Sequence, residues 1–339
     1  PHAAFGAAQT DRRRPWRWGN LMQTYILRRL LALLPTMLIA SIIVFVIVRM
    51  VPGDVVDLML SQNDAGSNKL TRDQLMETLG LDKPLWQQYG HWISRLLLHG
   101  DLGDSLWQGD SVLGMIAERL PVTFELGLLA MLIALTVAIP VGVYSAVKQD
   151  TAGDYATRSF SLLMLAVPSF WIGTMVTVFP SIWWGWSPEI HFTPFLEDPW
   201  ANLQQMLIPA TILGLSLSAI TMRMTRTMML EVLRQDYIRT ARAKGLSEML
   251  ILTRHAVRNA LIPVITLIGS QAPVLIGGAV ILEQIFVLPG MGLLLLDAVN
   301  QRDYPVVTGV FFIVGISVML INLLVDLSYG LIDPKVRQR

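Results

Sequence analysis

The sequence predicts an all-α membrane protein with six transmembrane helices. Of its 339 residues, 53% are apolar and only 15% are charged, and the mean hydropathy is +0.52. Six long runs contain no Asp, Glu, Lys or Arg, and about 20 apolar residues are enough to cross the ~30 Å hydrocarbon core. A backbone inside lipid must satisfy its own hydrogen bonds, so these runs are predicted to be helices. The short alternating segments of a β-barrel are absent.

The uncharged runs are Leu30–Val48, Leu126–Val147, Ser159–Ser187, Pro199–Met222, Asn259–Leu282 and Tyr304–Val325. With their flanking residues, the predicted spans are 30–48, 123–147, 159–187, 199–222, 259–283 and 304–327. A compact loop, 149–157, is expected between the second and third spans. Prolines and small residues interrupt several spans. This pattern is typical of close helix packing, and it also suits a bundle that must rock or open.

The distribution of Lys and Arg predicts the orientation. With both termini in the cytoplasm, 19 of the 26 Lys and Arg residues lie inside, as the positive-inside rule requires. Segments 1–29 and 328–339 are then cytoplasmic tails, and 49–122 and 284–303 are extracytoplasmic. The first 21 residues are polar and Arg-rich, so they are predicted to be neither a signal peptide nor a span. Trp183, Trp184 and Trp186 fit an interfacial belt at the outer end of the third span.

The first extracytoplasmic segment is predicted to contain an amphipathic helix on the outer surface. Its apolar positions recur at helical spacing, at Trp86, Tyr89, Trp92, Ile93 and Leu96. We expect this face to pack against the bundle. Contact with a delivered ligand or a docking protein is the alternative.

The basic cytoplasmic segment 223–258 carries the main candidate site. Two apolar stripes at helical spacing flank Gly245, and glycine favours a turn between two helices. The first stripe is Leu230, Leu233, Tyr237 and Ala241, and the second is Leu246, Met249, Leu250, Thr253 and Val257. We predict an elbow that docks into a partner protein and couples its motion to the spans. The alternative is an amphipathic loop that rests on the inner leaflet, held by its eight cations. The candidate coupling residues are Arg239, Thr240, Ala241, Arg242, Ala243, Lys244, Gly245 and Leu246.

A second set of candidates belongs to the pore or its gate. Gln271 and Gln284 are predicted to face the bundle interior, because polar side chains in hydrocarbon usually do. The block that begins at Glu283 is predicted to fold back as a re-entrant or surface loop, because Pro289, Gly290 and Gly292 prevent a continued helix. This block either caps the pore mouth structurally or forms a gate that meets a binding protein.

Several kinds of chemistry are missing from the sequence. There is no cysteine and no Gly-x-x-x-x-Gly-Lys-Ser/Thr phosphate loop. The five histidines (His2, His91, His99, His191 and His255) are scattered, and no residue set has metal-ligand spacing. Proton-driven carriers usually bury ionisable residues in mid-membrane, which the uncharged runs do not. The energy source is therefore expected in another subunit. A secondary carrier driven by an ion gradient is the main rival, and a membrane-embedded enzyme is a weaker one.

Seven blocks together resemble the permease subunits of dipeptide, oligopeptide and nickel ATP-binding-cassette importers, the dipeptide permease B type in particular. Gly245 and Ala241 occupy the glycine and second alanine of the family's Glu-Ala-Ala-x-x-x-Gly pattern, whereas Arg239 replaces its glutamate and Thr240 its first alanine. The blocks are Leu79–Tyr89, His99–Gly103, Asp236–Leu246, His255–Pro263, Glu283–Gly292, Arg302–Val307 and Asp333–Pro334.

The resemblance implies the type I importer permease fold and a non-catalytic subunit in the inner membrane. Its implied partners are a second homologous permease subunit, two ATPase subunits that bind ATP and Mg, and an extracytoplasmic substrate-binding protein, with no nucleic acid. No cofactor or metal is expected in this chain. Short peptides are the first expected cargo, with nickel complexes, opines, sugars or antimicrobial peptides as alternatives.

Overall fold

The computed structural model describes residues 18–50, 55–62 and 72–332, and every regular element within these ranges is a helix. Asp104 and Ser111 form an isolated antiparallel bridge. Residues 1–17 of the first predicted tail lie outside the described ranges, and so do residues 333–339 of the second, with the Asp333–Pro334 block.

Five stretches of the described part are long and apolar enough to cross a membrane, and a bent helix pair raises the number to six. The all-α membrane class predicted from the sequence is therefore confirmed. The five stretches lie in α1 (Trp18–Met50), α5 (Val112–Val147), α8 (Pro199–Leu233), the continuous segment Glu248–Ser270, and α14 (Tyr304–Ile332).

The helices α1, α5, α8 and α14 all extend beyond their predicted spans. Helix α5 begins at Val112, inside the segment predicted to be extracytoplasmic. Helix α8 continues to Leu233, so the first part of the predicted segment 223–258 is helical. No Gly or Pro interrupts the chain between Met222 and Arg234, and the buried Met229 extends the packed face of the helix into this segment. The appearance of charge marks a membrane boundary but does not end a helix.

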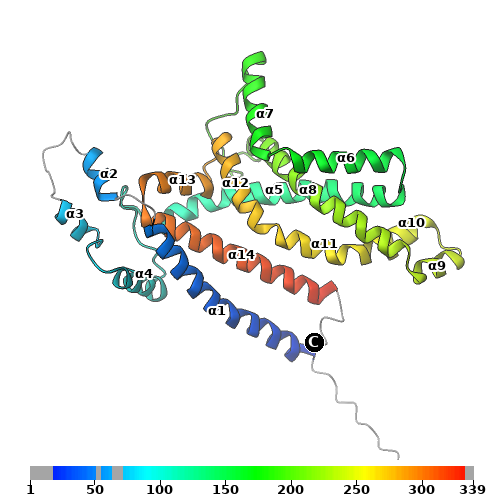
Figure 1. Cartoon of the computed structure of the whole chain (residues 1–339), viewed down its shortest axis with the longest axis horizontal. Coiled ribbons are helices and arrows are strands. Elements are labelled where there is room, and N and C mark those ends of the chain that lie inside the picture. The colour runs from blue at the N-terminus through cyan, green and yellow to red at the C-terminus, as the bar shows by residue number, and fades with distance from the viewer. Residues whose placement is uncertain (1–17, 51–54, 63–71, 333–339) are drawn as a thin grey trace, which may run out of the picture.

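The predicted third span is bent rather than straight. Helices α6 (Ala152–Ala166) and α7 (Ser169–Trp184) meet at an angle of 87°. Val167 is extended, with φ −94° and ψ 119°, because the following Pro168 disfavours the helical conformation at the preceding residue. The predicted loop 149–157 is also shorter than expected, since α6 begins at Ala152. Figure 1 shows α7 projecting away from the bundle.

The predicted fifth span is also divided. Helix α11 (Arg258–Ser270) ends at Ser270, and Gln271 separates it from α12 (Ala272–Ile285). After α12 the chain turns and forms α13 (Met291–Gln301), so most of the predicted loop 284–303 is helical. The predicted break near Pro289 and Gly290 is confirmed. Gly292, however, lies inside α13 rather than in a turn.

Helices α5 and α8 form the centre of the bundle. They pack against each other along most of their length, and small buried side chains such as Ala130 and Ala134 line the contact. A Cβ atom at Gly214 would lie 2.7 Å from the carbonyl oxygen of Ala130. The two backbones can therefore approach this closely only because glycine is present, as is common where helices pack in lipid.

Three short helices lie at one end of the molecule: α2 (Val55–Gln62), α3 (Arg72–Thr78) and α4 (Leu85–His99). The predicted amphipathic helix is confirmed as α4. Its Trp92 is buried and packs edge-on against Phe312, with ring centroids 5.7 Å apart, whereas Trp86 is exposed. The expected packing against the bundle is therefore present.

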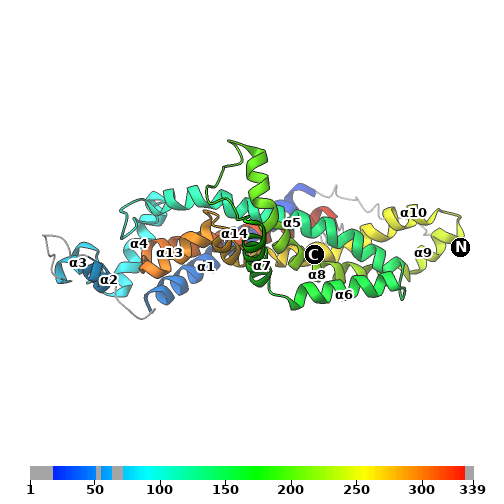
Figure 2. The ribbon, with the colours of Figure 1, turned by 90° about the horizontal axis from the view of Figure 1, so that it is seen from above.

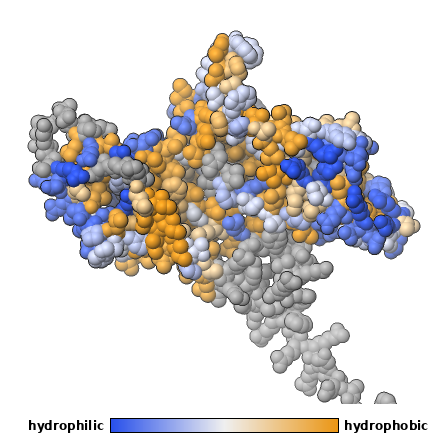
Figure 3. Space-filling view, viewed as in Figure 1, coloured by the Kyte–Doolittle hydropathy of each residue, from blue (hydrophilic) through white to orange (hydrophobic). Residues whose placement is uncertain are grey.

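The opposite end contains α9 (Asp236–Ala243) and α10 (Glu248–Leu250). We call residues 236–250 the elbow. Figures 1 and 2 place α2–α4 and the elbow at the two extremes of the long axis. Polar surface gathers at both extremes, with apolar surface between them (Figure 3). This zonation is that of a protein whose middle lies in hydrocarbon.

Candidate functional site

The elbow has the predicted helix–glycine–helix geometry. Helix α9 ends at Ala243, and Gly245 follows with φ +79°, a left-handed conformation that glycine adopts without strain. The N–H of Gly245 donates to the carbonyl of Arg242 at 2.9 Å, and the N–H of Leu246 donates to the carbonyl of Ala241 at 3.3 Å. These two bonds form a Schellman motif, which satisfies carbonyls that the end of the helix leaves free.

The elbow is anchored by one narrow face. Ile238 and Ala241 are buried in a cluster with Met229 of α8 and with Ala256 and Ala260 beyond the elbow. Of the eight candidate coupling residues, Ala241 is the one that is buried, and the other seven are exposed. The elbow therefore presents nearly all of its polar side chains outward.

The second apolar stripe predicted for the elbow, which begins at Leu246, does not form a buried face. Leu246, Met249 and Leu250 are exposed, whereas Ile251 and Ala256 are buried. Residues Ile251–Val257 form a π-helix between α10 and α11. A π-helix bonds residue i to i+5, so apolar positions spaced for 3.6 residues per turn do not line up on one face here.

Two side-chain contacts tie the elbow together. Arg242 donates from Nε and Nη2 to the carboxylate of Glu248 at 2.7 and 3.2 Å, which bridges the two sides of the Gly245 turn. The amide nitrogen of Asn259, on α11, donates to the hydroxyl of Tyr237, on α9, at 3.0 Å. Both contacts are exposed, so each contributes orientation more than stability.

The turn between α12 and α13 is built around Glu283. This carboxylate is buried and accepts from the Thr123 hydroxyl at 2.6 Å, from the Gly292 N–H at 2.7 Å and from the Leu293 N–H at 3.2 Å. It thereby caps the N-terminus of α13 and ties it to α5. Thr123 in turn accepts from the N–H of Met291 at 2.8 Å.

The other gate candidates have different environments. Gln284 is exposed, so the prediction that it faces the bundle interior is wrong within this chain, because its neighbour Glu283 takes the buried face of α12. Pro289 is half-buried and Gly290 is buried. Gln271 is buried, and its Nε2 donates to the hydroxyl of Thr221 at 3.0 Å, so its amide nitrogen contacts α8. Their roles in a pore or gate remain predictions.

Two blocks that carry the family resemblance meet at the α4 end. Asp303, from the block Arg302–Val307, is buried and accepts from the Ser105 hydroxyl at 2.6 Å. Nearby, Asp101 of the block His99–Gly103 accepts from the Gly103 N–H at 2.8 Å and from Arg95 Nε at 2.8 Å. Donation from the Gly103 N–H lowers the pKa of the Asp101 carboxyl below its ordinary value, and Arg95 adds to the effect. A cavity of about 690 Å³ opens beside these residues.

The structure reveals a buried ion pair that the sequence reasoning missed. Asp154 of α6 is completely buried and forms an ion pair with Arg226 of α8, with 2.8 Å between Oδ2 and Nη2. The signal was hidden because Asp154 lay in a predicted loop and Arg226 in a general basic segment. Among the described residues, no group of three His, Asp or Glu side chains could hold a metal ion.

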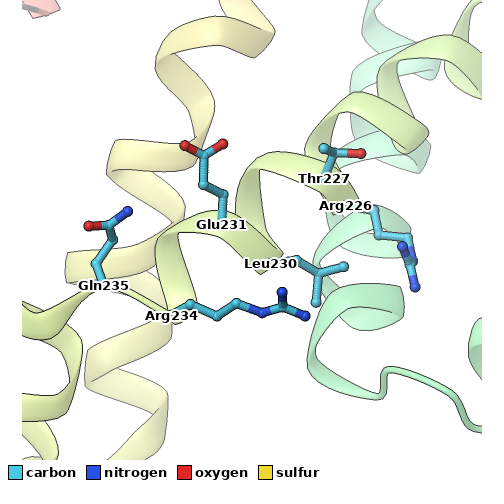
Figure 4. Close-up of a pocket in the computed structure, with 6 residues that line it drawn as sticks. All are labelled: Arg226, Thr227, Leu230, Glu231, Arg234 and Gln235. Atoms are coloured by element: carbon cyan, nitrogen blue, oxygen red, sulfur yellow. The ribbon is translucent and has the colours of Figure 1, made fainter.

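Arg226 also lines a hollow of about 450 Å³ along the last turns of α8. Figure 4 shows that Arg226, Leu230 and Arg234 project to one side of this helix, whereas Glu231 projects to another. The hollow lies between the ion pair and the start of the elbow.

Fold and site together define a polytopic helical membrane subunit with a polar, outward-facing elbow at one end. The chain belongs to the family described as binding-protein-dependent transport system inner membrane component, which matches residues 138–338. The N-terminal region of such membrane components matches residues 22–127. This membership confirms the resemblance inferred from the seven blocks and the permease fold that it implied.

Similar proteins cover nearly the whole chain. A putative peptide transport system permease protein of Brucella melitensis is 43% identical over 317 residues, which are 94% of this chain and 99% of that protein. The dipeptide transport system permease protein DppB of Escherichia coli K12 is 40% identical over 341 residues, which cover 94% of this chain and 100% of that protein. The di/tripeptide transport system permease protein DppB of Pseudomonas aeruginosa is 38% identical, with the same coverage.

Proposed function

We propose that this chain is the membrane-spanning permease subunit of an ATP-driven, binding-protein-dependent importer of short peptides, and that it forms half of the translocation pore. The observation that carries this proposal is end-to-end similarity to peptide and dipeptide permeases, at 38–43% identity over 94% of the chain. Membership of the binding-protein-dependent family supports the same role.

The proposed complex divides the work among several subunits. A second homologous permease completes the pore, two ATPases bind ATP and Mg beneath it, and an extracytoplasmic binding protein delivers the peptide. The apolar side chains that α7 leaves exposed, such as Phe179, Ile182 and Trp183, suit a second permease or lipid. The chain itself is non-catalytic. It lies in the inner membrane with both termini in the cytoplasm, so the elbow is cytoplasmic.

The elbow is proposed to dock into the ATPases. Its exposed positions offer cations and apolar side chains together, including Arg239, Lys244 and Met249. Its buried positions, Ile238 and Ala241, attach it to α8 and to the segment leading into α11. A displacement of α9 would therefore move these long helices as a rigid body. Nucleotide can shift the pore only if the ATPases grip the elbow differently in the two states.

Short peptides are proposed as cargo because the similar proteins are named for peptide, dipeptide or di/tripeptide transport. The six uncharged runs suit a permissive pore whose selectivity comes from the binding protein. Nickel complexes, opines or sugars are the alternatives within the same class.

Crosslinking in the assembled complex tests the docking role. The chain has no cysteine, so a single cysteine can be placed at Thr240 or Ala243 without a background thiol. We expect both to crosslink to an ATPase subunit, whereas a cysteine at the exposed Trp86 of α4 should not. An intact complex in which no exposed elbow position reaches an ATPase would contradict the proposal.

Uptake by the reconstituted complex tests the energy source and the cargo. Radiolabelled Ala-Ala should enter proteoliposomes only with ATP, the ATPases and the binding protein all present. Ion-driven uptake by this chain without ATPases would instead favour the secondary-carrier alternative. ATP-dependent uptake of nickel or a sugar, without peptide uptake, would correct the cargo alone.

A further inference from the structure

The ion pair between α6 and α8 is part of a polar cluster in which both carboxylate oxygens of Asp154 accept hydrogen bonds. Arg226 donates from Nε to Oδ1 and from Nη2 to Oδ2 of Asp154, each at 2.8 Å, so the contact is bidentate. The Ser145 hydroxyl donates to Oδ1 of the same carboxylate, and the backbone N–H of Asp150 donates to Oδ2 at 3.0 Å. Arg158 lies 3.7 Å from Oδ1. We call Ser145, Asp154 and Arg226 the clasp.

The clasp holds three helices at one point. Ser145 comes from α5, Asp154 from the first turn of α6 and Arg226 from α8. Ser145 and Asp154 are almost completely buried, and the Arg226 side chain is 17% exposed. Figure 1 shows α5, α6 and α8 running side by side, and α6 packs against both of the others.

The clasp adjoins the buried anchor of the elbow. Ala146 follows Ser145 on α5, and Met229 lies one turn after Arg226 on α8. Both belong to the apolar cluster that holds Ile238 and Ala241 of α9. Movement of the elbow anchor therefore reaches the clasp through residues adjacent to it on two helices.

We propose that the clasp is a positioning device for transport, which makes α6 follow α8 whenever the elbow is displaced. A buried ion pair adds little net stability over well-packed apolar side chains, but it strongly disfavours separation of its partners. A bidentate Arg–carboxylate contact also restricts their relative orientation. The clasp therefore suits a joint that must stay rigid while the surrounding bundle changes shape.

The bent pair formed by α6 and α7 reaches the α12–α13 turn, where the gate candidates lie. Helix α6 turns by 87° into α7, which packs against α12. Ile172 and Val176 of α7 lie against the apolar cluster that includes Leu282 and Phe286, the neighbours of Glu283. The clasp would thus connect the elbow, through α8, α6 and α7, to the α12–α13 turn.

This inference rests on the proposed function, and its test is separable from it. The wild-type complex must first show ATP-driven Ala-Ala uptake; failure there overturns the proposed function. The clasp is then tested with two variants. Asp154→Asn removes the charge at nearly the same volume, and Arg226→Lys keeps the charge but cannot form the bidentate contact of the guanidinium group. Arg223→Lys, at an exposed position one turn earlier, is the matched control.

We expect Asp154→Asn to lower the amount of peptide imported per ATP hydrolysed by roughly tenfold, and Arg226→Lys by less, in complexes of unchanged composition. Arg223→Lys should leave this ratio unchanged. If the clasp only stabilised the fold, the variants would lower peptide uptake and ATP hydrolysis together, in proportion to the amount of folded complex. Such a parallel loss, or a wild-type ratio in both clasp variants, overturns the proposal.

The distance between α6 and α8 provides a second readout, which does not depend on how much of the complex is folded. Spin labels on cysteines introduced at Leu162 of α6 and Ile220 of α8, both exposed, report the separation of the two helices. In the wild-type complex we expect one narrow distribution that is the same without nucleotide and with ADP and vanadate trapped in the ATPases after ATP hydrolysis. In Arg226→Lys the two states should differ. A wild-type distance that changes with nucleotide would show that α6 does not follow α8 and would overturn the proposal.

Discussion

The elbow and the α12–α13 turn both reverse the chain next to a glycine, but they are held in opposite ways. The elbow is exposed, and its turn is closed by backbone hydrogen bonds with two buried apolar side chains beneath it. The α12–α13 turn is mostly buried, with Val287 exposed, and the carboxylate of Glu283 closes it. The elbow points most of its side chains outward, whereas Phe286, Leu288 and Gly290 of the α12–α13 turn are buried.

The two glycines show the same contrast. A Cβ atom at Gly245 would meet no atom within 4 Å, so only its φ of +79° constrains the residue. A Cβ atom at Gly290 would lie 2.3 Å from the carboxyl carbon of Glu283, so there it is space that requires glycine. The elbow should therefore tolerate changes of side chain but not of backbone, and the buried turn should tolerate neither.

The largest effect is expected from Glu283→Ala. This change leaves the Thr123 hydroxyl and the N–H groups of Gly292 and Leu293 without their acceptor, at a cost of about 3–5 kcal/mol in stability. The measurement is thermal stability of the purified subunit in detergent. The control is Gln284→Ala at the neighbouring exposed position. Equal stability of the two variants would mean that the carboxylate does not hold the turn.

Gly245→Pro should have the next largest effect. Proline removes the N–H that bonds to Arg242 and imposes φ near −65°, at a local cost of roughly 3 kcal/mol. Peptide uptake should be lost while the subunit remains inserted in the membrane. Gly245→Asn, which tolerates positive φ, should keep most of the uptake. Wild-type uptake in a well-expressed Gly245→Pro variant would refute the coupling role of the elbow.

Gly290→Ala should have an intermediate effect, through crowding alone. The added methyl displaces the Glu283 carboxylate, and overpacking of this kind costs about 1–3 kcal/mol. Gly315→Ala in α14, where a Cβ atom meets nothing within 4 Å, is the control and should be neutral or slightly stabilising. The thermal stabilities of the two variants can be compared directly, and equal values would contradict the space argument.

The smallest effect is expected from Arg242→Ala. The Arg242–Glu248 pair is exposed, so removing it should leave the thermal stability unchanged within error. If the elbow docks as proposed, uptake can fall even though stability does not. Measuring both in one variant separates the folding contribution of this surface from its contribution to docking.

Much of the candidate site was predictable because its chemistry is local. Gly245 between two helical patterns predicted the elbow, and Pro289 with Gly290 predicted the end of α12. The face of the second elbow helix was predicted wrongly, because the π-helix Ile251–Val257 changes the number of residues per turn. Pro168 could have indicated the bend in the third span, since proline restricts the residue before it.

The sequence by itself determined the class of this protein, the six apolar stretches and the position of the elbow. These follow from hydropathy, charge distribution and backbone preferences, which act over a few residues at a time. Only the tertiary structure decided the partners of the buried carboxylates: Arg226 for Asp154, Thr123 for Glu283 and Ser105 for Asp303. Each pair joins residues from different helices or loops, and which side chains meet depends on how whole helices dock. No local pattern contains that information, because a polar residue that will be buried and one that will be exposed look the same along the chain.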